Sequence, residues 1–419
     1  MPSPITVNKE RLLERFLRYV QVGTAANPEC SDYPSSPGQL ELGKLLTQEL
    51  ADLGLDDVHQ DENGLVWATV PASVEGDLPT VLFNSHVDTS PEAPGDGVKP
   101  NVIESYQGGD ITLAKDDRVI RVRDCPELAG LKGHCLVTTD GTTLLGGDDK
   151  AGVACIMELA ATLIENRQLP HGPVRVLFTC DEEIGLGAKH MDLAKAAADA
   201  GYTLDGAGHD ELEQENFSAD QVVVRAVGYN IHPAIAKDRM VNATRALSDF
   251  VSRLPHDRLS PESTDGREGF LHPYDFQGGV SEASCKILLR DFETAKLDEY
   301  ENRLHETAAE SNKRFPKIKF EIERSRQYRN MADSMKAAPH VAEFARRAYA
   351  DLGRECHMGA IRGGTDGAVF SEMGLPTPNL SSGQHNIHSV LEFASITEMT
   401  WAVEHAIQLL KIWQEHGRS

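Results

Sequence analysis

The sequence predicts an α/β fold in which a doubly wound mixed sheet is interrupted by a smaller α+β domain. Apolar runs of strand length, at residues 65–70, 80–88 and 172–179, alternate with stretches of helical periodicity. This alternation is typical of a sheet that carries helices on both faces. The pattern changes near Asn216, and amphipathic helices return only after residue 330. We therefore expect two domains, the smaller inserted into the larger.

The elements of the first part follow in order from the N-terminus. Apolar residues at helical spacing predict helices over residues 12–20 and 40–53, with Gly54 ending the second. The runs "LVWATV" and "TVLFNSHVD" predict strands, and "GPVRVLFT" is typical of a strand buried on both faces. Residues 153–164 have one apolar face, which predicts the helix before that last strand.

The middle of the chain predicts the inserted domain. The runs "QVVVRAVGYN", "CKILLRDF" and "KIKFEIERS" predict strands, and residues 241–254 and 296–314 predict helices. Two further amphipathic helices then lead to the C-terminus. We expect a discontinuous larger domain of residues 1–216 plus 330–419, and an insert of residues 217–329.

Composition excludes several classes of protein. The 419 residues hold 41 Lys plus Arg against 65 Asp plus Glu, a net charge of −24 that repels nucleic acid and anionic lipid. The seven cysteines are scattered without a C-x-x-C pair, as in a reducing compartment. The N-terminal residues are charged where a signal peptide is apolar, and no run reaches the roughly 18 apolar residues of a membrane helix. We expect a cytoplasmic protein that binds neither nucleic acid nor membrane.

Residues that can bind a metal recur where predicted strands end. His86 and Asp88 are two positions apart, so both side chains leave the same strand face, and a carboxylate commonly orients an imidazole ligand. Asp148 and Asp149 follow glycines at a predicted helix start. Taken alone, H-x-D also fits a surface pair, and the two aspartates also fit a helix N-cap.

Two later acidic or histidine-containing segments extend this pattern. Glu182 and Glu183 can face one site only if their strand has ended, and then one can bind metal while the other stays free as a base. Asp205 lies at another predicted strand end. His385 and His388 lie in a polar loop, where either also fits an ordinary surface position.

The order of these motifs resembles the peptidase T family, the tripeptide aminopeptidases among the dizinc metallopeptidases related to carboxypeptidase G and the carnosinases. The resemblance spans nearly the whole chain, through "SHVDTSP", "TLLGGDDKAG", "DEEIGLGAKH", "IHPAIAK", "LLRDF" and "IRGGTDGA". It implies that the larger domain is catalytic and that the insert is a lid that also forms a homodimer. It further implies a cis peptide bond between Asp148 and Asp149.

The resemblance also implies two divalent metal ions, with zinc the first choice and Co²⁺ or Mn²⁺ compatible with the same donors. One ion is held by His86, Asp148 and Asp205. The other is held by Asp148, Glu183 and His388, so that Asp148 bridges the two.

Other roles follow from the same resemblance. Glu182 corresponds to the general base, and Asp88 to the partner that orients His86. Asp181 is expected to start a helix or to face solvent. The resemblance implies that the lid histidine reaches the active site of the partner subunit and that the arginines hold the peptide carboxylate. The implied substrate-binding residues are His232, Asn242, Arg290 and Arg362.

The lead hypothesis is a zinc-dependent hydrolase of peptide catabolism that releases the N-terminal residue from tripeptides. The alternative keeps the dizinc site but acts on dipeptides or N-acyl amino acids, because Ala234, Gln384 and His385 depart from the family pattern around the expected pocket. A third hypothesis is a metal-binding dimer without activity. A protein that had lost its activity would be expected to lose metal ligands or the general base, yet Glu182 and all five implied ligands are present.

Overall fold

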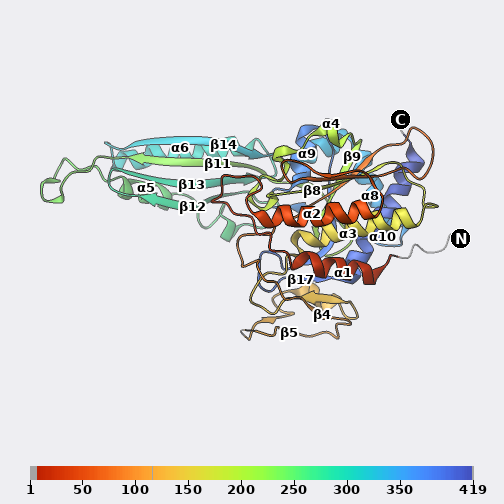
Figure 1. Ribbon diagram of the computed structural model, residues 1–419. Helices are drawn as coiled ribbons and strands as arrows, with labels where there is room; N and C mark the ends of the chain where they lie inside the picture. The colour runs from red at the N-terminus through yellow and green to blue at the C-terminus, as the bar shows by residue number, and fades with distance from the viewer. Residues whose placement is uncertain (1–6, 116, 418–419) are drawn as a thin grey trace. The chain divides into compact units, whose positions relative to one another are not determined.

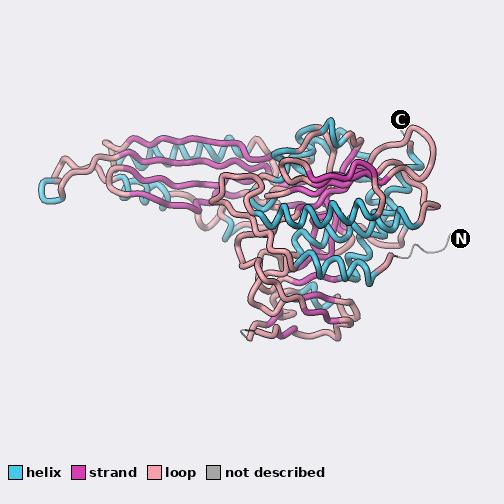
Figure 2. The backbone as a smooth tube through the Cα atoms, in the orientation of Figure 1, coloured by secondary structure: helices cyan, strands magenta, loops and turns pink. Residues whose placement is uncertain are grey.

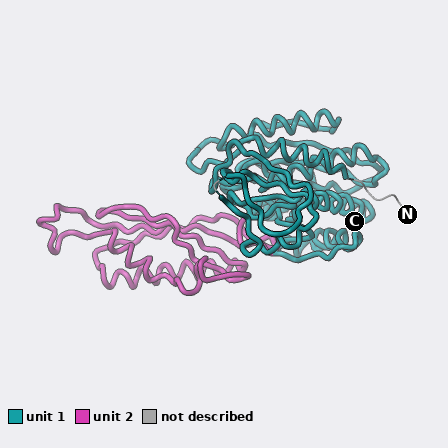
Figure 3. The backbone as a smooth tube through the Cα atoms, turned by 90° about the horizontal axis from the view of Figure 1, so that it is seen from below, with its two compact units in different colours: residues 1–214, 333–359, 365–419 teal, residues 215–332, 360–364 magenta. Residues whose placement is uncertain are grey.

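The computed structural model describes residues 7–115 and 117–417, and the chain divides into two compact units (Figure 3). Unit 1 comprises Met1–Gln214, Asp333–Gly359 and Thr365–Ser419. Unit 2 comprises Glu215–Ala332 and Ala360–Gly364. The sequence assigned residues 360–364 to the larger domain, but the N–H of Phe217 donates to the carbonyl of Ile361 at 3.0 Å and ties this segment to unit 2.

Within the described residues, unit 1 is built on an 11-stranded mixed sheet. Its path runs β1 (Asp56–Gln60), β2 (Val66–Val70), β8 (Val174–Thr179), β3 (Val81–His86), β9 (Ala200–Ala207), β16 (Asn379–His385), β17 (Phe393–Ser395), β7 (Leu136–Thr138) and β4 (Asn101–Ile103). Beside it, β10 (Glu211–Asn216) pairs with β15 (His357–Ile361) and β16. The four central strands, β8, β3, β9 and β16, run parallel, and their neighbours are antiparallel.

Helices cover both faces of this sheet (Figures 1 and 2). One face carries α1 (Lys9–Val20), α2 (Pro37–Asp52), α3 (Gly147–Glu165), α8 (Pro339–Asp351) and α10 (Ile396–His416), and the other carries α4 (Leu193–Ala196) and α9 (Asp366–Met373). Alternate strand residues divide between two cores: Phe83 and Val176 join the larger, while Leu82 and Leu177 pack with Phe370 of α9. The predicted doubly wound α/β class is confirmed.

Smaller elements complete unit 1. The strands β5 (Ile111–Thr112) and β6 (Val119–Ile120) and the 3-10 helix η1 (Pro126–Gly130) lie between β4 and β7 in the chain and share a core of their own. Two 3-10 turns, η2 (Glu182–Ile184) and η3 (Gly187–His190), follow β8, and α7 (Ala332–Ala337) precedes α8. The strand predicted to run to Asp88 ends at His86, so Asp88 belongs to the loop that follows.

Unit 2 is a four-stranded antiparallel sheet with two helices on one face. The strand order is β12 (Phe270–Gly278), β13 (Glu282–Asp291), β11 (Ser218–Val227) and β14 (Lys319–Tyr328). The helices are α5 (Ala243–Ser252) and α6 (Lys296–Arg314), and the 3-10 turns are η4 (Pro233–Ile235) and η5 (Pro261–Ser263). Their core includes Val222, Leu247, Leu289 and Leu304. The sequence did not predict β12, which contains Pro273 and lies at the edge, where proline is tolerated.

The main crossings of the chain into and out of unit 2 are joined by paired hydrogen bonds. The N–H of Asn216 donates to the side-chain oxygen of Asn330 at 3.1 Å, and the N–H of Met331 donates to the side-chain oxygen of Asn216 at 2.8 Å. The entry and exit segments of the insert therefore lie side by side. Among the described residues, no helix is both long and apolar enough to cross a bilayer.

Candidate metal centre

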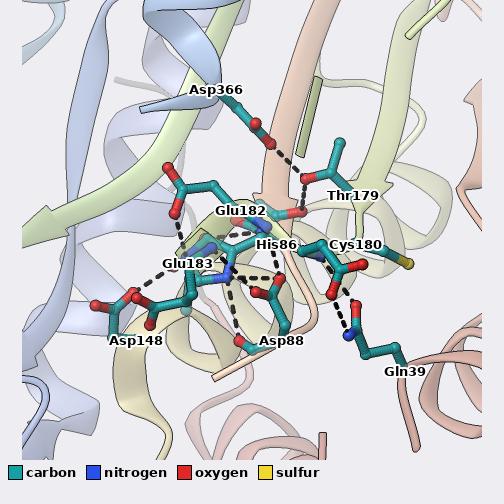
Figure 4. Close-up of polar contacts among 12 residues, drawn as sticks. Gln39, His86, Asp88, Asp148, Thr179, Cys180, Glu182, Glu183 and Asp366 are labelled. Atoms are coloured by element: carbon teal, nitrogen blue, oxygen red, sulfur yellow. Dashed lines mark hydrogen bonds and ion pairs between the residues drawn. The ribbon is translucent and has the colours of Figure 1, made fainter. Parts of the chain in front are cut away.

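The five predicted metal ligands gather in unit 1, where the parallel strands reach their carboxyl ends. His86 is the last residue of β3, Asp205 is near the end of β9, and Glu183 follows β8. Asp148 lies in the first turn of α3, and His388 lies in the loop after β16. Figure 4 shows His86, Asp148 and Glu183 converging there.

The ligand atoms form two groups that share Asp148. His86, Asp148 and Asp205 make one group, and Asp148, Glu183 and His388 make the other, with the atoms of each group within 4.8 Å of one another. The Nε2 of His86 lies 3.1 Å from Asp148 Oδ1, and the Nε2 of His388 lies 3.2 Å from Asp148 Oδ2. Asp148 thus turns one carboxylate oxygen to each histidine, as a bridging ligand would.

Both histidines have their second ring nitrogen occupied. The Nδ1 of His86 contacts the main-chain oxygen of Asp88 at 3.1 Å, and the Nδ1 of His388 contacts the carboxylate of Glu92 at 3.2 Å. Donation of the Nδ1 hydrogen to these oxygens turns each Nε2 toward the carboxylates, where its lone pair can bind a cation once the ring is neutral. A ligating histidine commonly has this arrangement.

The Asp148–Asp149 segment does not form a simple N-cap. Gly146 occupies the cap position, both aspartates have non-helical backbone angles, and the peptide bond between them is cis, as the resemblance implied. The side chain of Asp149 is buried and accepts the main-chain N–H of His86 at 3.2 Å. The two aspartates therefore serve different segments of the site.

The adjacent glutamates share the site because β8 ends before them. Asp181 and Gly185, with φ of 61° and 74°, bracket the 3-10 turn that carries both side chains. Glu183 Oε2 lies 3.0 Å from His388 Nε2. Glu182 belongs to neither ligand group; its Oε2 lies 3.9 Å from His86 Nε2, and its side chain is 16% exposed. This geometry separates a ligand position from a free carboxylate.

Asp181 occupies the cap position of the 3-10 turn, which agrees with the predicted helix start, but it does not face solvent. It is fully buried, and its carboxylate accepts hydrogen bonds from Ser35 and Gln39, while its own N–H donates to Gln39 at 3.0 Å. These donors offset the cost of burying the charge. Figure 4 shows Gln39 reaching toward this turn. Asp181 therefore anchors the glutamate turn to the start of α2.

Asp88 supports three parts of the site. Its carboxylate accepts the main-chain N–H groups of Glu182 at 3.1 Å and Glu183 at 3.0 Å, and lies 3.4 Å from Nδ1 of His86. The predicted contact with His86 is thus made partly by the carboxylate and partly by the main-chain oxygen. Asp88 holds the glutamate turn as well as the imidazole.

The electrostatics of the cluster fit divalent cations. Burial and the nearby charge of Asp148 raise the pKa of Asp205 to about 6 and that of Glu183 to about 7. Hydrogen bonds with Asp148 and Glu183 raise the pKa of His388 to about 11. Oε1 of Glu183 is buried without a hydrogen-bond partner in the described structure. Carboxylate and imidazole donors that crowd together in this way match the donor set of Zn²⁺.

Three nearby residues were not predicted from the sequence. Glu92 contacts His388 as described, and Asp366 accepts a hydrogen bond from Thr179 Oγ1 at 2.6 Å. Burial raises the pKa of Asp366 to about 7. Neither acid could be singled out from the sequence, because each contact joins segments that lie far apart in the chain. Figure 4 shows Asp366 pointing to Thr179.

The predicted substrate-binding residues all lie in unit 2. His232 is exposed before η4, and Asn242 caps α5 by accepting the N–H of Arg245 at 3.1 Å. Arg290 donates to the main-chain oxygen of Arg362 at 3.3 Å, so the structure brings the two arginines together. Arg362 also donates to carbonyl oxygens of the loop at residues 264–268. Their substrate-binding roles stay predictions.

Gln384 and His385 were expected around the substrate pocket. They are 1% and 4% exposed, so neither side chain is open to a substrate. Gln384 Nε2 donates to the main-chain oxygen of Asp205 at 2.9 Å, and His385 pairs with Glu398 at 2.6 Å. Neighbouring residues of a strand point to opposite faces of the sheet, and β16 is buried along its length. Both side chains therefore lie inside unit 1.

Comparison with known proteins agrees with this site. Residues 138–411 match Peptidase family M20/M25/M40. A protein of Geobacillus thermodenitrificans (strain NG80-2) named Peptidase T is 42% identical over 408 residues, which cover 97% of this chain and 99% of that protein.

Solved structures extend the likeness. Aminopeptidase PepT from Bacillus cereus ATCC 10987 has a TM-score of 0.74 and 26% identity, covering 97% of this chain and 99% of its own. A tripeptidase from Staphylococcus aureus subsp. aureus Mu50 has a TM-score of 0.76, with 22% identity over 98% of this chain and 99% of its own, and shows the same fold. The chain therefore belongs to peptidase family M20/M25/M40 and resembles the proteins named Peptidase T along nearly its whole length.

Proposed function

We propose that this protein is a metal-dependent aminopeptidase that releases the N-terminal residue from tripeptides. One observation carries the proposal: Asp148 presents an oxygen to each of two histidine-carboxylate groups, beside a Glu182 that belongs to neither. The names of similar proteins, Peptidase T and tripeptidase, support the choice of substrate.

Two divalent cations, Zn²⁺ first, would occupy the two groups. His86, Asp148 and Asp205 would hold one, and Asp148, Glu183 and His388 the other. When bound, such cations supply positive charge that polarises the scissile carbonyl and acidifies an attacking water. The Nδ1 contacts of His86 and His388 keep each Nε2 directed at its group.

Glu182 acts as the general base in this proposal. Its carboxylate takes the proton of the attacking water and delivers it to the leaving amine. Asp88 fixes the backbone of Glu182 and Glu183 through their N–H groups, so both carboxylates keep their directions. Burial raises the pKa of Glu182 well above its ordinary value, which makes it a stronger proton acceptor.

Arg290 is the best placed of the proposed substrate-binding residues. Its side chain is partly exposed, and its Nε has no hydrogen-bond partner among the described residues, so the guanidinium keeps donor capacity for the peptide carboxylate. Arg362 is more committed, because its terminal nitrogens already donate to the loop at residues 264–268. We assign Asn242 to the peptide backbone, and His232 to the oxyanion in the active site of the partner subunit.

A panel of blocked and unblocked peptides tests the proposal. Chelator-stripped protein is assayed on a free tripeptide, a dipeptide and the N-acetylated tripeptide, with and without added Zn²⁺. We expect activity on the free tripeptide alone, and only with metal. Full activity on the acetylated peptide would indicate an N-acyl amino acid hydrolase, and activity on the dipeptide alone a dipeptidase.

A further inference from the structure

Glu392 connects the two segments that carry Asp148 and His388. Its side chain is 1% exposed, and its carboxylate accepts three main-chain hydrogen bonds from the loop that leads into α3. Oε2 accepts the N–H of Leu145 at 2.7 Å and of Gly146 at 2.8 Å. Oε1 accepts the N–H of Asp148 at 3.0 Å. The carboxylate therefore holds the backbone of the shared ligand directly.

The same residue closes the loop that carries His388. Residues 386–392 connect β16 to β17, which are paired in antiparallel register. The N–H of Glu392 donates to the carbonyl of Ser389 at 3.1 Å, and the side chain of Asn386 donates to the carbonyl of Leu391 at 3.0 Å. His388 has a φ of 58°, a conformation that a non-glycine residue keeps only where its surroundings hold it.

The position of Glu392 suits a buried carboxylate. The first N–H groups of a helix lack partners within the helix, and the helix dipole favours a negative charge at that end. At the start of α3, Glu392 accepts such N–H groups and places a negative charge at that end of the helix. Gly147 leaves the necessary room, since a Cβ there would lie 3.2 Å from Glu392 Oε1. The carboxylate therefore connects the loop before α3 to the loop between β16 and β17.

We propose that Glu392 is a positioning residue that fixes Asp148 relative to His388 and thereby sets the affinity of both metal positions. It is not itself a member of either ligand group. Because Asp148 belongs to both groups, a shift of its backbone disturbs both. This inference rests on the proposed ligand roles. It assigns a function to a side chain that touches neither the substrate nor a metal position.

The test measures metal binding without any substrate. Chelator-stripped wild type and Glu392→Gln are titrated with Zn²⁺ alone, in competition with a chromophoric chelator. The glutamine keeps the size of the side chain but turns an amide NH₂ toward backbone N–H donors. We expect roughly 10- to 100-fold weaker binding of both ions, the usual cost of losing an outer-shell partner.

Glu158→Gln is the matched control. Glu158 is also fully buried, lies in α3, and accepts from Arg11 and Arg15, but it contacts no proposed ligand. We expect Glu158→Gln to lose stability while keeping wild-type affinity for Zn²⁺. If Glu392→Gln does not fold, Gly147→Ala gives a second route, because its methyl group crowds Glu392 Oε1.

The outcomes are distinct. Weakened binding of both ions in Glu392→Gln or Gly147→Ala, with normal binding in Glu158→Gln, supports the inference. Wild-type affinity in the Glu392 variant, or an equal loss in the Glu158 control, overturns it. A wild type that binds no Zn²⁺ would instead overturn the ligand assignment on which the proposed function depends, and the inference with it.

Discussion

Glu182 and Glu183 are neighbours in the chain, yet their carboxylates meet different partners. Glu183 faces His388 at 3.0 Å, whereas Glu182 stands apart from both ligand groups. The 3-10 turn after β8 produces this difference, because a continued strand would have sent the two side chains to opposite faces. The turn therefore separates the proposed metal ligand from the proposed general base.

Substitution of each glutamate separates these roles. Glu182→Gln should retain both metals and lose roughly 10²- to 10⁴-fold in kcat, because an amide cannot accept the proton of the water. Glu183→Ala should lose metal as well, since it removes a ligand. Turnover numbers and metal content per chain are the measurements. Near wild-type turnover in metal-saturated Glu182→Gln would show that the two assignments are wrong.

The sequence predicted the residues of the two groups better than the residues that support them. His86, Asp148 and Glu183 stand in short motifs whose order resembles a known family, so they could be found one by one. Glu92 and the burial of Asp181 could not, because each depends on a contact between segments far apart in the chain. No local sequence pattern encodes such a contact. The sequence around an acid in a loop looks the same whether the acid contacts water or a buried hydroxyl group.

Elements were predicted where periodicity was strong. The helices α6 and α10 and the buried strand β8 have clear apolar patterns, and the structure contains them. The edge strand β12 was missed because Pro273 and its polar residues obscure the alternation. The central elements can therefore be predicted from the sequence, whereas an edge strand forms because a neighbouring strand pairs with it.

The packing of α8 against α10 includes a buried histidine that should make stability depend on pH. His405 contacts the main-chain oxygen of Ala345 at 2.9 Å and stacks on Tyr349 with ring centroids 3.6 Å apart. Burial lowers the pKa of His405 to about 4. Below about pH 6.5 the unfolded chain binds a proton that the folded chain resists, so stability falls between about pH 6.5 and pH 4.

Comparison with His405→Gln separates the pH dependence due to His405 from that of the other titrating groups. At pH 7 the wild type should be more stable, because it keeps the stacking contact. The difference in free energy of unfolding should shrink as the pH falls toward 4, by up to about 3 kcal/mol. Urea unfolding at pH 7, 6 and 5 measures it. A difference that stays constant over this range would contradict the prediction.

For the whole molecule, the proposed function requires recognition of both ends of a short peptide. Amidation of the C-terminus removes the charge that Arg290 is proposed to bind, and should cost on the order of 2 to 4 kcal/mol in kcat/KM. The matched control is Arg290→Gln, which should discriminate little between the free and the amidated peptide. If wild type cleaves both peptides equally well, Arg290 does not bind the carboxylate.

Assembly is the second prediction at this scale. Tyr274 and Phe276 on the edge strand β12 are 44% and 45% exposed, and an exposed apolar edge favours pairing with another chain. We expect a homodimer at micromolar concentration by light scattering, and dissociation in Phe276→Lys. A monomeric wild type would count against the role of His232 in a partner subunit.

The paired asparagines at the base of unit 2 bear on the history of the protein. Asn216 and Asn330 bring the entry and exit of this insert together, and the insert has a hydrophobic core of its own. A module with adjoining ends can enter an ancestral gene, or leave it, in one recombination event, without rethreading the host fold. The larger domain can then keep the residues of its site while related proteins differ in the inserted domain.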